Sequence, residues 1–101
     1  MIRHIEMIKI NEVVDGKFRA EQLQELVATL EKVVGNAEGI ASHKLMSRSE
    51  CHDPMDADLL LVIDFENRDA LKEYDLDLDR VAIYMEIAEH AESMLTYEYE
   101  L

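Results

Sequence analysis

The sequence has few of the residues that cross-link or interrupt a chain. It contains one cysteine, one proline, three glycines and no tryptophan. A single cysteine excludes an internal disulfide and is typical of a reducing compartment. Three glycines leave little room for a phosphate-binding loop, and no nucleotide fingerprint or nucleophile elbow is found. The sequence therefore predicts no nucleotide cofactor.

Long apolar runs are also missing. No stretch approaches the roughly 20 apolar residues that cross a membrane, and charges interrupt the N-terminal segment too early for a secretory signal. Apolar residues make up 49% of the chain and charged residues 33%, which is typical of a globular protein. The length of 101 residues fits one domain, residues 1–101. We predict a single-domain cytoplasmic protein.

Basic residues are scarce in the second half of the chain. The formal net charge is -13, and residues 51–101 carry 3 basic and 15 acidic side chains. Phosphate backbones and anionic membranes require clustered lysine and arginine. We therefore predict that neither nucleic acid nor a membrane is a partner. The acidity is interpreted as solvated helix faces, with an acidic interaction surface as the alternative.

Hydrophobic periodicity predicts an ordered series of strands and helices. Strands are expected at Ile2–Asn11, Gly39–Arg48, Leu59–Phe65 and Leu95–Leu101, and helices at Ala20–Val34, Asn67–Tyr74 and Arg80–Ser93. A turn is expected at Asp15-Gly16, a helix stop at Gly35-Asn36 and a loop at Ser49–Ala57. This order predicts a ferredoxin-like α+β fold, in which a four-stranded antiparallel sheet has helices on one face.

The first predicted strand carries large apolar residues on both of its faces. One face holds Ile2, His4, Glu6, Ile8 and Ile10, and the other holds Arg3, Ile5, Met7 and Lys9. The unbroken apolar run at Leu59–Ile63 is likewise typical of a strand covered on both sides. Helices on one face leave the other uncovered, so a second copy of the chain is expected there. The sequence thus predicts a homodimer joined through the sheet face.

Several segments resemble the stress-responsive dimeric α+β barrel (Dabb) family, in the same order and over nearly the full length. They are the opening MIRHI, the acidic loop, the stretch LLLVIDFENRDALKEY and the closing LTYEYEL. The resemblance implies a homodimer in which two sheets pack face to face as a barrel. It also implies a pocket in each monomer between the sheet and the helices.

Members of that family carry an aromatic residue followed by His-Pro-x-His just before the last helix. Here the aromatic is Tyr74, while Asp77, Leu78 and Arg80 stand at the positions of the first histidine, the proline and the second histidine. In a polyketide cyclase of the family the second histidine is the general base, and a guanidinium cannot accept a proton. The resemblance leaves His4, on the pocket-lining first strand, and Tyr74 as catalytic candidates.

Each candidate residue has a functional and a structural interpretation. His4 is either a pocket acid or base, or a histidine hydrogen-bonded within the sheet or dimer; no partner base is visible nearby in the sequence. Tyr74 either donates to a ligand carbonyl or belongs to the core with its hydroxyl at the rim. Arg80 either clamps an anionic ligand or pairs with Asp77 or Glu73. We favour the structural interpretation of all three.

Acidic residues alternate ahead of the last predicted helix and match part of a calcium-loop template. They are Asp75, Asp77, Asp79 and, further on, Glu86. Arg80 stands where that loop requires glycine, so the aspartates are interpreted as helix caps. Cys51 and His52 are adjacent but have no second Cys-His pair, and are interpreted as surface residues. We predict no metal and no cofactor.

Two functions remain open. The first is a non-catalytic homodimer that binds a small apolar or anionic molecule between sheet and helices, and the loss of both motif histidines favours it. The alternative is a cofactor-independent enzyme, polyketide-cyclase-like or monooxygenase-like, that uses His4 and Tyr74. An open pocket that reaches both side chains would favour the enzyme. We expect the first function.

Overall fold

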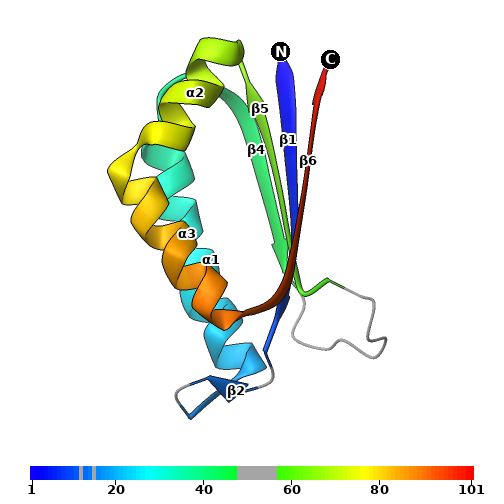
Figure 1. Ribbon diagram of the computed structural model, residues 1–101, viewed down its shortest axis with the longest axis vertical. Helices are drawn as coiled ribbons and strands as arrows, with labels where there is room; N and C mark the ends of the chain where they lie inside the picture. Colours follow the sequence, from blue (N-terminus) through cyan, green and yellow to red (C-terminus); the bar gives the residue numbers. More distant parts are fainter. Residues whose placement is uncertain (12, 15, 48–56) are drawn as a thin grey trace.

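The computed structural model describes residues 1–11, 13–14, 16–47 and 57–101, which form two layers (Figure 1). The sheet consists of β1 (Ile2–Ile10), β4 (Ile40–Ser47), β5 (Leu59–Phe65) and β6 (Ala91–Glu100). The helices are α1 (Arg19–Asn36), α2 (Arg68–Leu76) and α3 (Leu78–His90), and all lie on one face of the sheet. This architecture confirms the predicted ferredoxin-like α+β fold.

The strands are antiparallel and follow the order β4-β5-β1-β6. β1 is therefore central, between β5 and the C-terminal strand β6. The two ends of the chain lie side by side, and the Leu101 N–H donates to the Met1 carbonyl at 2.9 Å (Figure 1). In this register His4 lies opposite Ile63 on β5 and opposite Glu98 on β6.

The predicted alternation along β1 is confirmed by the burial of its side chains. Ile2, Ile8 and Ile10 are buried on the helix face, whereas Met7 on the other face is 43% exposed. Nine large apolar side chains of the core are fully buried. They are Ile8, Ile10, Leu30, Val34, Leu59, Leu61, Ile63, Phe65 and Ile87. The core of the monomer thus lies between the sheet and the helices.

The first helix is longer than predicted. It runs from Arg19 to Asn36, so it ends within the predicted stop at Gly35-Asn36, although Gly35 itself is still helical. The turn after the helix is made instead at Gly39, whose φ of 77° lies in the left-handed region. A Cβ at Gly39 would lie 2.5 Å from the Cβ of Ala70, so α2 packs directly on this glycine.

A two-stranded hairpin precedes the first helix, formed by β2 (Val13–Val14) and β3 (Lys17–Phe18). Gly16 has a φ of 76° in the turn between them, which agrees with the predicted Asp15-Gly16 turn. Asp15 itself lies outside the described residues. The hairpin extends below the end of the main sheet (Figure 1).

The predicted boundary between the last helix and the last strand is wrong. The helix was expected to run to Ser93, but α3 ends at His90 and β6 begins at once with Ala91. Ala91 pairs with Ile10 and Ser93 pairs with Lys9, so both belong to the sheet rather than to the helix. Pairing with the central strand overrides the helical spacing of these residues.

The predicted loop at Ser49–Ala57, with Cys51 and His52, lies outside the described residues except for Ala57. Among the described helices, none combines the length and apolar character needed to cross a membrane.

Candidate functional site

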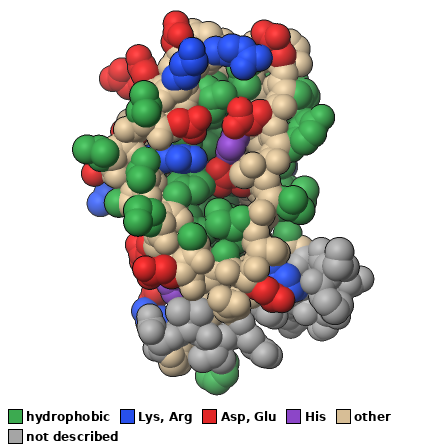
Figure 2. Space-filling view, in the orientation of Figure 1, with side chains coloured by type: hydrophobic (Ala, Val, Ile, Leu, Met, Phe, Trp, Pro, Cys, Tyr) green, Lys and Arg blue, Asp and Glu red, His purple; other side chains and the backbone are tan. Residues whose placement is uncertain are grey.

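The surface is hollowed between α3 and β6, and charged side chains gather in this hollow (Figure 2). A histidine, a basic side chain and several carboxylates lie there among apolar groups. We call the contributing residues the polar cluster. It consists of His4, Glu6, Tyr74, Arg80, Tyr84 and Glu98. The cluster combines side chains from β1, β6, α2 and α3, so the tertiary fold assembles it.

His4 is buried and bridges two carboxylates. Its Nε2 is 2.5 Å from Glu6 Oε1, and its Nδ1 is 2.8 Å from Glu98 Oε1. Burial acts to lower the pKa of His4, but the hydrogen bonds and charges of Glu6 and Glu98 outweigh it and raise the pKa. Two carboxylate partners favour an imidazolium that donates from both nitrogens. In this arrangement His4 is a cationic bridge with no free lone pair to accept a proton.

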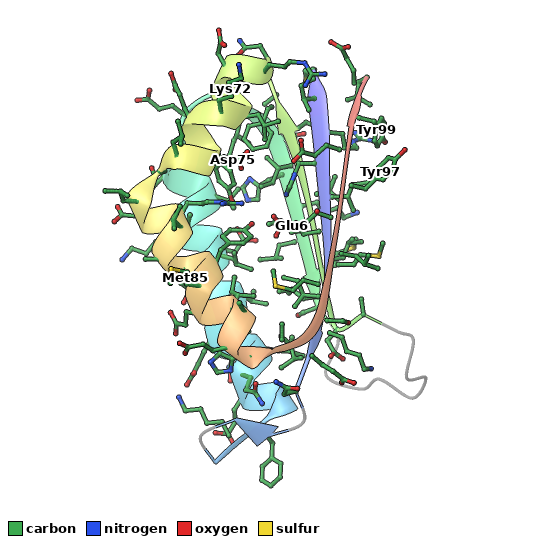
Figure 3. All side chains as sticks on the ribbon, in the orientation of Figure 1. Glu6, Lys72, Asp75, Met85, Tyr97 and Tyr99 are labelled. Carbon is green, nitrogen blue, oxygen red and sulfur yellow. The ribbon has the colours of Figure 1, made fainter. Side chains whose placement is uncertain are left out.

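Glu6 is the residue that the sequence reading missed. Its side chain is 1% exposed, and it lies between the sheet and α3 (Figure 3). Oε1 binds His4, whereas Oε2 is buried without a hydrogen-bond partner among the described residues. An unsatisfied buried polar atom costs about 1–3 kcal/mol and is rare in native proteins. The sequence did contain a signal, because His4 and Glu6 lie two apart on one face of a strand.

Two tyrosines form the wall of the cluster on the side of the helices. The hydroxyls of Tyr74 and Tyr84 are 3.3 Å apart, and the Tyr74 ring packs on Phe65 with centroids 5.2 Å apart. Burial raises the pKa of both hydroxyls, and the charge of Glu6 raises each further. Both hydroxyls therefore stay protonated at neutral pH and can donate hydrogen bonds. Tyr84 lies in the helix predicted at Arg80–Ser93 but was not among the candidate site residues.

Arg80 covers the tyrosines. Its guanidinium carbon lies 4.0 Å from the ring centroid of Tyr84 and 5.1 Å from that of Tyr74, which is cation–π geometry. Nη2 pairs with Asp75 Oδ1 at 3.5 Å. Nε is buried without a partner among the described residues. Hydrogen bonding to Glu6 also raises the pKa of Tyr84, and hydrogen bonding to Arg80 acts to lower that of Tyr74, so the two tyrosine hydroxyls lie next to the carboxylate and the guanidinium.

The predicted pairing of Arg80 with Asp77 or Glu73 is wrong, since its ion pair is with Asp75. Asp77 has another use. Its Oδ1 accepts the backbone N–H groups of Asp79 and Arg80 at 2.8 and 3.2 Å, so it caps α3. This confirms the interpretation of that aspartate as a helix cap. Among the described residues no three His, Cys, Asp or Glu side chains are grouped to hold a metal ion.

A separate groove of about 720 Å³ lies between α1 and α3. Its lining includes Ala28, Val33, Asp79 and Ala82. A smaller groove of about 300 Å³ at one end of α1 is lined in part by Tyr74. Neither groove is lined by His4 or Glu6, and Tyr74 is the member of the polar cluster that lines the smaller one.

Comparison with known proteins identifies the family of the chain. Residues 2–101 match the stress responsive A/B barrel (Dabb) domain family. A dimeric ferredoxin-like protein of unknown function from Thermobifida fusca is 19% identical, with a TM-score of 0.81 over 99% of this chain and 90% of that one. No curated protein matches the chain.

Structures of enzymes share the fold as well. A hydroxynitrile lyase from Passiflora edulis is 11% identical, with a TM-score of 0.80 over 99% of this chain and 92% of that one. A cofactor-independent oxygenase from Streptomyces nogalater is 7% identical, with a TM-score of 0.74 over 99% of this chain and 91% of that one. Identities this low show a common ferredoxin-like fold, and the fold accommodates several activities.

Proposed function

Because the chain belongs to the stress responsive A/B barrel (Dabb) family, we propose that it is a homodimer that binds a small molecule in each hollow between α3 and β6. The observation that carries this proposal is the polar cluster, which brings charged and hydroxyl side chains from four elements together at a hollow in the surface (Figure 2). A concave site in which a few polar groups converge among apolar side chains is typical of small-molecule binding.

Binding is favoured over catalysis by the chemistry of the motif positions. Asp77, at the position of the first motif histidine, is occupied as the cap of α3. Arg80, at the position of the second, cannot act as a base. His4 already binds a carboxylate through each ring nitrogen. His4, Tyr74 and Arg80 are therefore proposed as ligand-binding residues.

The homodimer is supported by the sheet face opposite the helices. That face carries apolar side chains that are widely exposed in the monomer. They include Leu95 and Tyr97, each 67% exposed, Met7 at 43% and Met46 at 41%. Tyr97 and Tyr99 extend away from the helices (Figure 3). A second copy of the chain would bury this surface, and several similar structures are described as dimeric.

Sedimentation and a fragment screen test the two parts of the proposal. The protein should sediment at micromolar concentration with about twice the 11.7 kDa mass of one chain. Small aromatic fragments should shift the backbone amide resonances of β1 and α3. A single-chain mass would contradict the homodimer. Binding in the hollow would be contradicted if the fragments shifted only the resonances of residues that line the groove between α1 and α3, or shifted no resonances.

A second candidate function is cofactor-independent acid–base catalysis. It is favoured by Glu6, whose Oε2 is unpartnered in the described residues and lies close to protonated tyrosine hydroxyls. A buried carboxylate can accept a proton from a bound molecule, and neighbouring hydroxyl donors can stabilise the oxyanion that forms. In this alternative Tyr74 donates, and His4 holds Glu6 rather than reacting itself. Conversion of a bound fragment during the same screen would distinguish catalysis from binding.

A further inference from the structure

We propose that the groove between α1 and α3 is a docking site for a basic amphipathic helix of another protein. The apolar side of that helix lies in the groove, and its lysine and arginine side chains face the acidic residues along α3. The groove belongs to the layer of helices, whereas the proposed small-molecule site is the hollow between α3 and β6. The two proposals can therefore be tested separately.

The first step is the shape of the groove. His90 Nδ1 and Gln22 Oε1, 2.9 Å apart, join the C-terminal end of α3 to the N-terminal half of α1. The groove of about 720 Å³ extends toward the other end of α3, where Val33 on α1 and Ile83 on α3 are among its lining residues. A groove between two helices has the shape that receives a third helix, and this volume accommodates several large apolar side chains.

The second step is the apolar surface next to the groove. Leu78 and Met85 are 82% and 67% exposed, and they lie four residues before and three residues after Ala82, which lines the groove. This spacing places all three on one side of α3, and Met85 lies on the helix layer away from the sheet (Figure 3). In the proposed homodimer the sheet faces meet, so this surface stays uncovered. A continuous apolar surface of this kind is typical of a protein-binding site.

The third step is the charge around the groove, which decides between partners. Asp77 and Asp79 line the groove together with Lys32, and Glu86 and Glu89 are exposed on the following turns of α3. Among the described residues, Asp79, Glu86 and Glu89 take part in no ion pair. A second copy of this chain, with its net charge of -13, would bring like charges together, and an anionic membrane would be repelled. The charge therefore favours a basic partner.

Three synthetic peptides test the docking site by titration of the whole chain, followed through backbone amide resonances. The probe is a helical peptide of about 15 residues, made of leucine and lysine with the leucines at helical spacing. One control has glutamate in place of lysine, and the other has the residues of the probe in an order that forms no apolar side. The probe should shift the resonances of residues that line the groove. It should bind at least about tenfold more tightly than either control.

Two matched variants locate the binding. Ala82 and Ala88 are both exposed on α3, but Ala82 lines the groove and Ala88 does not. Ala82→Arg should weaken binding of the probe at least about tenfold, because a long cationic side chain fills the groove and repels the lysines. Ala88→Arg adds the same charge outside the groove and should keep the affinity within about threefold, because salt screens exposed charges. If Ala82→Arg does not fold, the three peptides measured with the unmodified protein still decide.

Several results would overturn this inference. Equal weakening by Ala82→Arg and Ala88→Arg would show that the probe is held by general charge attraction rather than by the groove. Equal binding of the probe and either control peptide, no binding of the probe, or shifts confined to another surface would also contradict it. Assemblies larger than a dimer that Ala82→Arg dissociates would show that a second copy of the chain occupies the groove. None of these results would bear on small-molecule binding in the hollow, which the fragment screen tests.

Discussion

The two faces of the sheet share the same alternation of side chains but differ in what covers them. On the helix face the chain buries its own apolar residues, such as Ile8 and Ile63, completely. On the open face Leu95 and Tyr97 remain 67% exposed. A single chain therefore completes only one of the two cores that its strands can form. In the proposed homodimer a second chain covers the other face.

Charged groups at neighbouring positions of β1 sharpen this contrast. Arg3, on the open face, binds both oxygens of Asp64 at 2.8 and 2.9 Å, and Ser42 donates to the same carboxylate at 3.1 Å. His4, on the helix face, binds Glu6, whose second oxygen has no partner among the described residues. Both oxygens of the open-face carboxylate are bonded, whereas the helix-face carboxylate keeps an unused acceptor. This difference separates a structural ion pair from a candidate site.

The largest expected effect comes from a charge placed on the open face. Leu95→Asp should convert the dimer to folded monomers, because each interface would bury uncompensated carboxylates. An unpaired buried charge costs about 3–5 kcal/mol, which weakens association more than a hundredfold. Sedimentation should then give a mass near the 11.7 kDa of one chain, with the circular dichroism of the helices retained.

Met85→Asp is the matched control for that variant. Met85 is also 67% exposed, but it lies on α3, in the opposite layer of the molecule. The same apolar-to-acidic change should leave the dimer intact. If both variants dissociated, or neither did, the open face would not be the interface.

The strands show how much of the fold can be predicted from the sequence. The predicted bounds of β5, Leu59–Phe65, agree with the structure. A short, unbroken apolar run bounded by polar residues is typical of a buried strand. Residues 91–93 were misassigned to a helix. Their spacing suits either structure, and only the pairing of Ala91 with Ile10 decides. Local pattern cannot contain that information, since the two residues are far apart in the sequence.

The site was less predictable than the fold. His4 and Glu6 share a strand face, so their contact could have been inferred from the alternation alone. Glu98 joins them only through the register between β1 and β6, which the sequence does not state. Arg80 was expected to pair with neighbours in the chain, but Asp77 is occupied as a helix cap and Arg80 stacks on Tyr84 instead. Long-range geometry thus determines the Glu98 contact, whereas the contacts of Arg80 with Asp75 and Tyr84 are close in the sequence and depend on how α2 and α3 meet.

The two ion pairs should respond to pH in opposite directions. The pKa of His4 is raised in the folded protein, so its stabilisation is complete below its unfolded value of about 6.5 and is lost as pH rises through the folded pKa. The pKa of Asp64 is lowered, chiefly by Arg3, so its stabilisation is present above about 3.8 and is lost as pH falls through the folded pKa.

Urea unfolding at fixed protein concentration across this pH range would separate the two faces. His4→Gln should reduce the loss of stability at high pH and leave the loss at low pH unchanged. Asp64→Asn should do the reverse. A high-pH loss that persists in His4→Gln would show that the helix-face pair does not contribute as its geometry indicates.

The smallest expected effect tests whether the open-face pair is fully satisfied. Ser42→Ala removes the hydroxyl that donates to Asp64 Oδ2, but Arg3 still binds both oxygens of that carboxylate. No acceptor is left empty, so the loss should be only about 0.5–1.5 kcal/mol of unfolding free energy. Ser93→Ala, an exposed serine of β6, controls for the loss of a strand hydroxyl and should change stability by less. Equal losses in the two variants would mean that Ser42 adds nothing to the ion pair. A loss of about 3 kcal/mol or more of unfolding free energy would mean that Asp64 depends on the Ser42 hydroxyl as well as on Arg3.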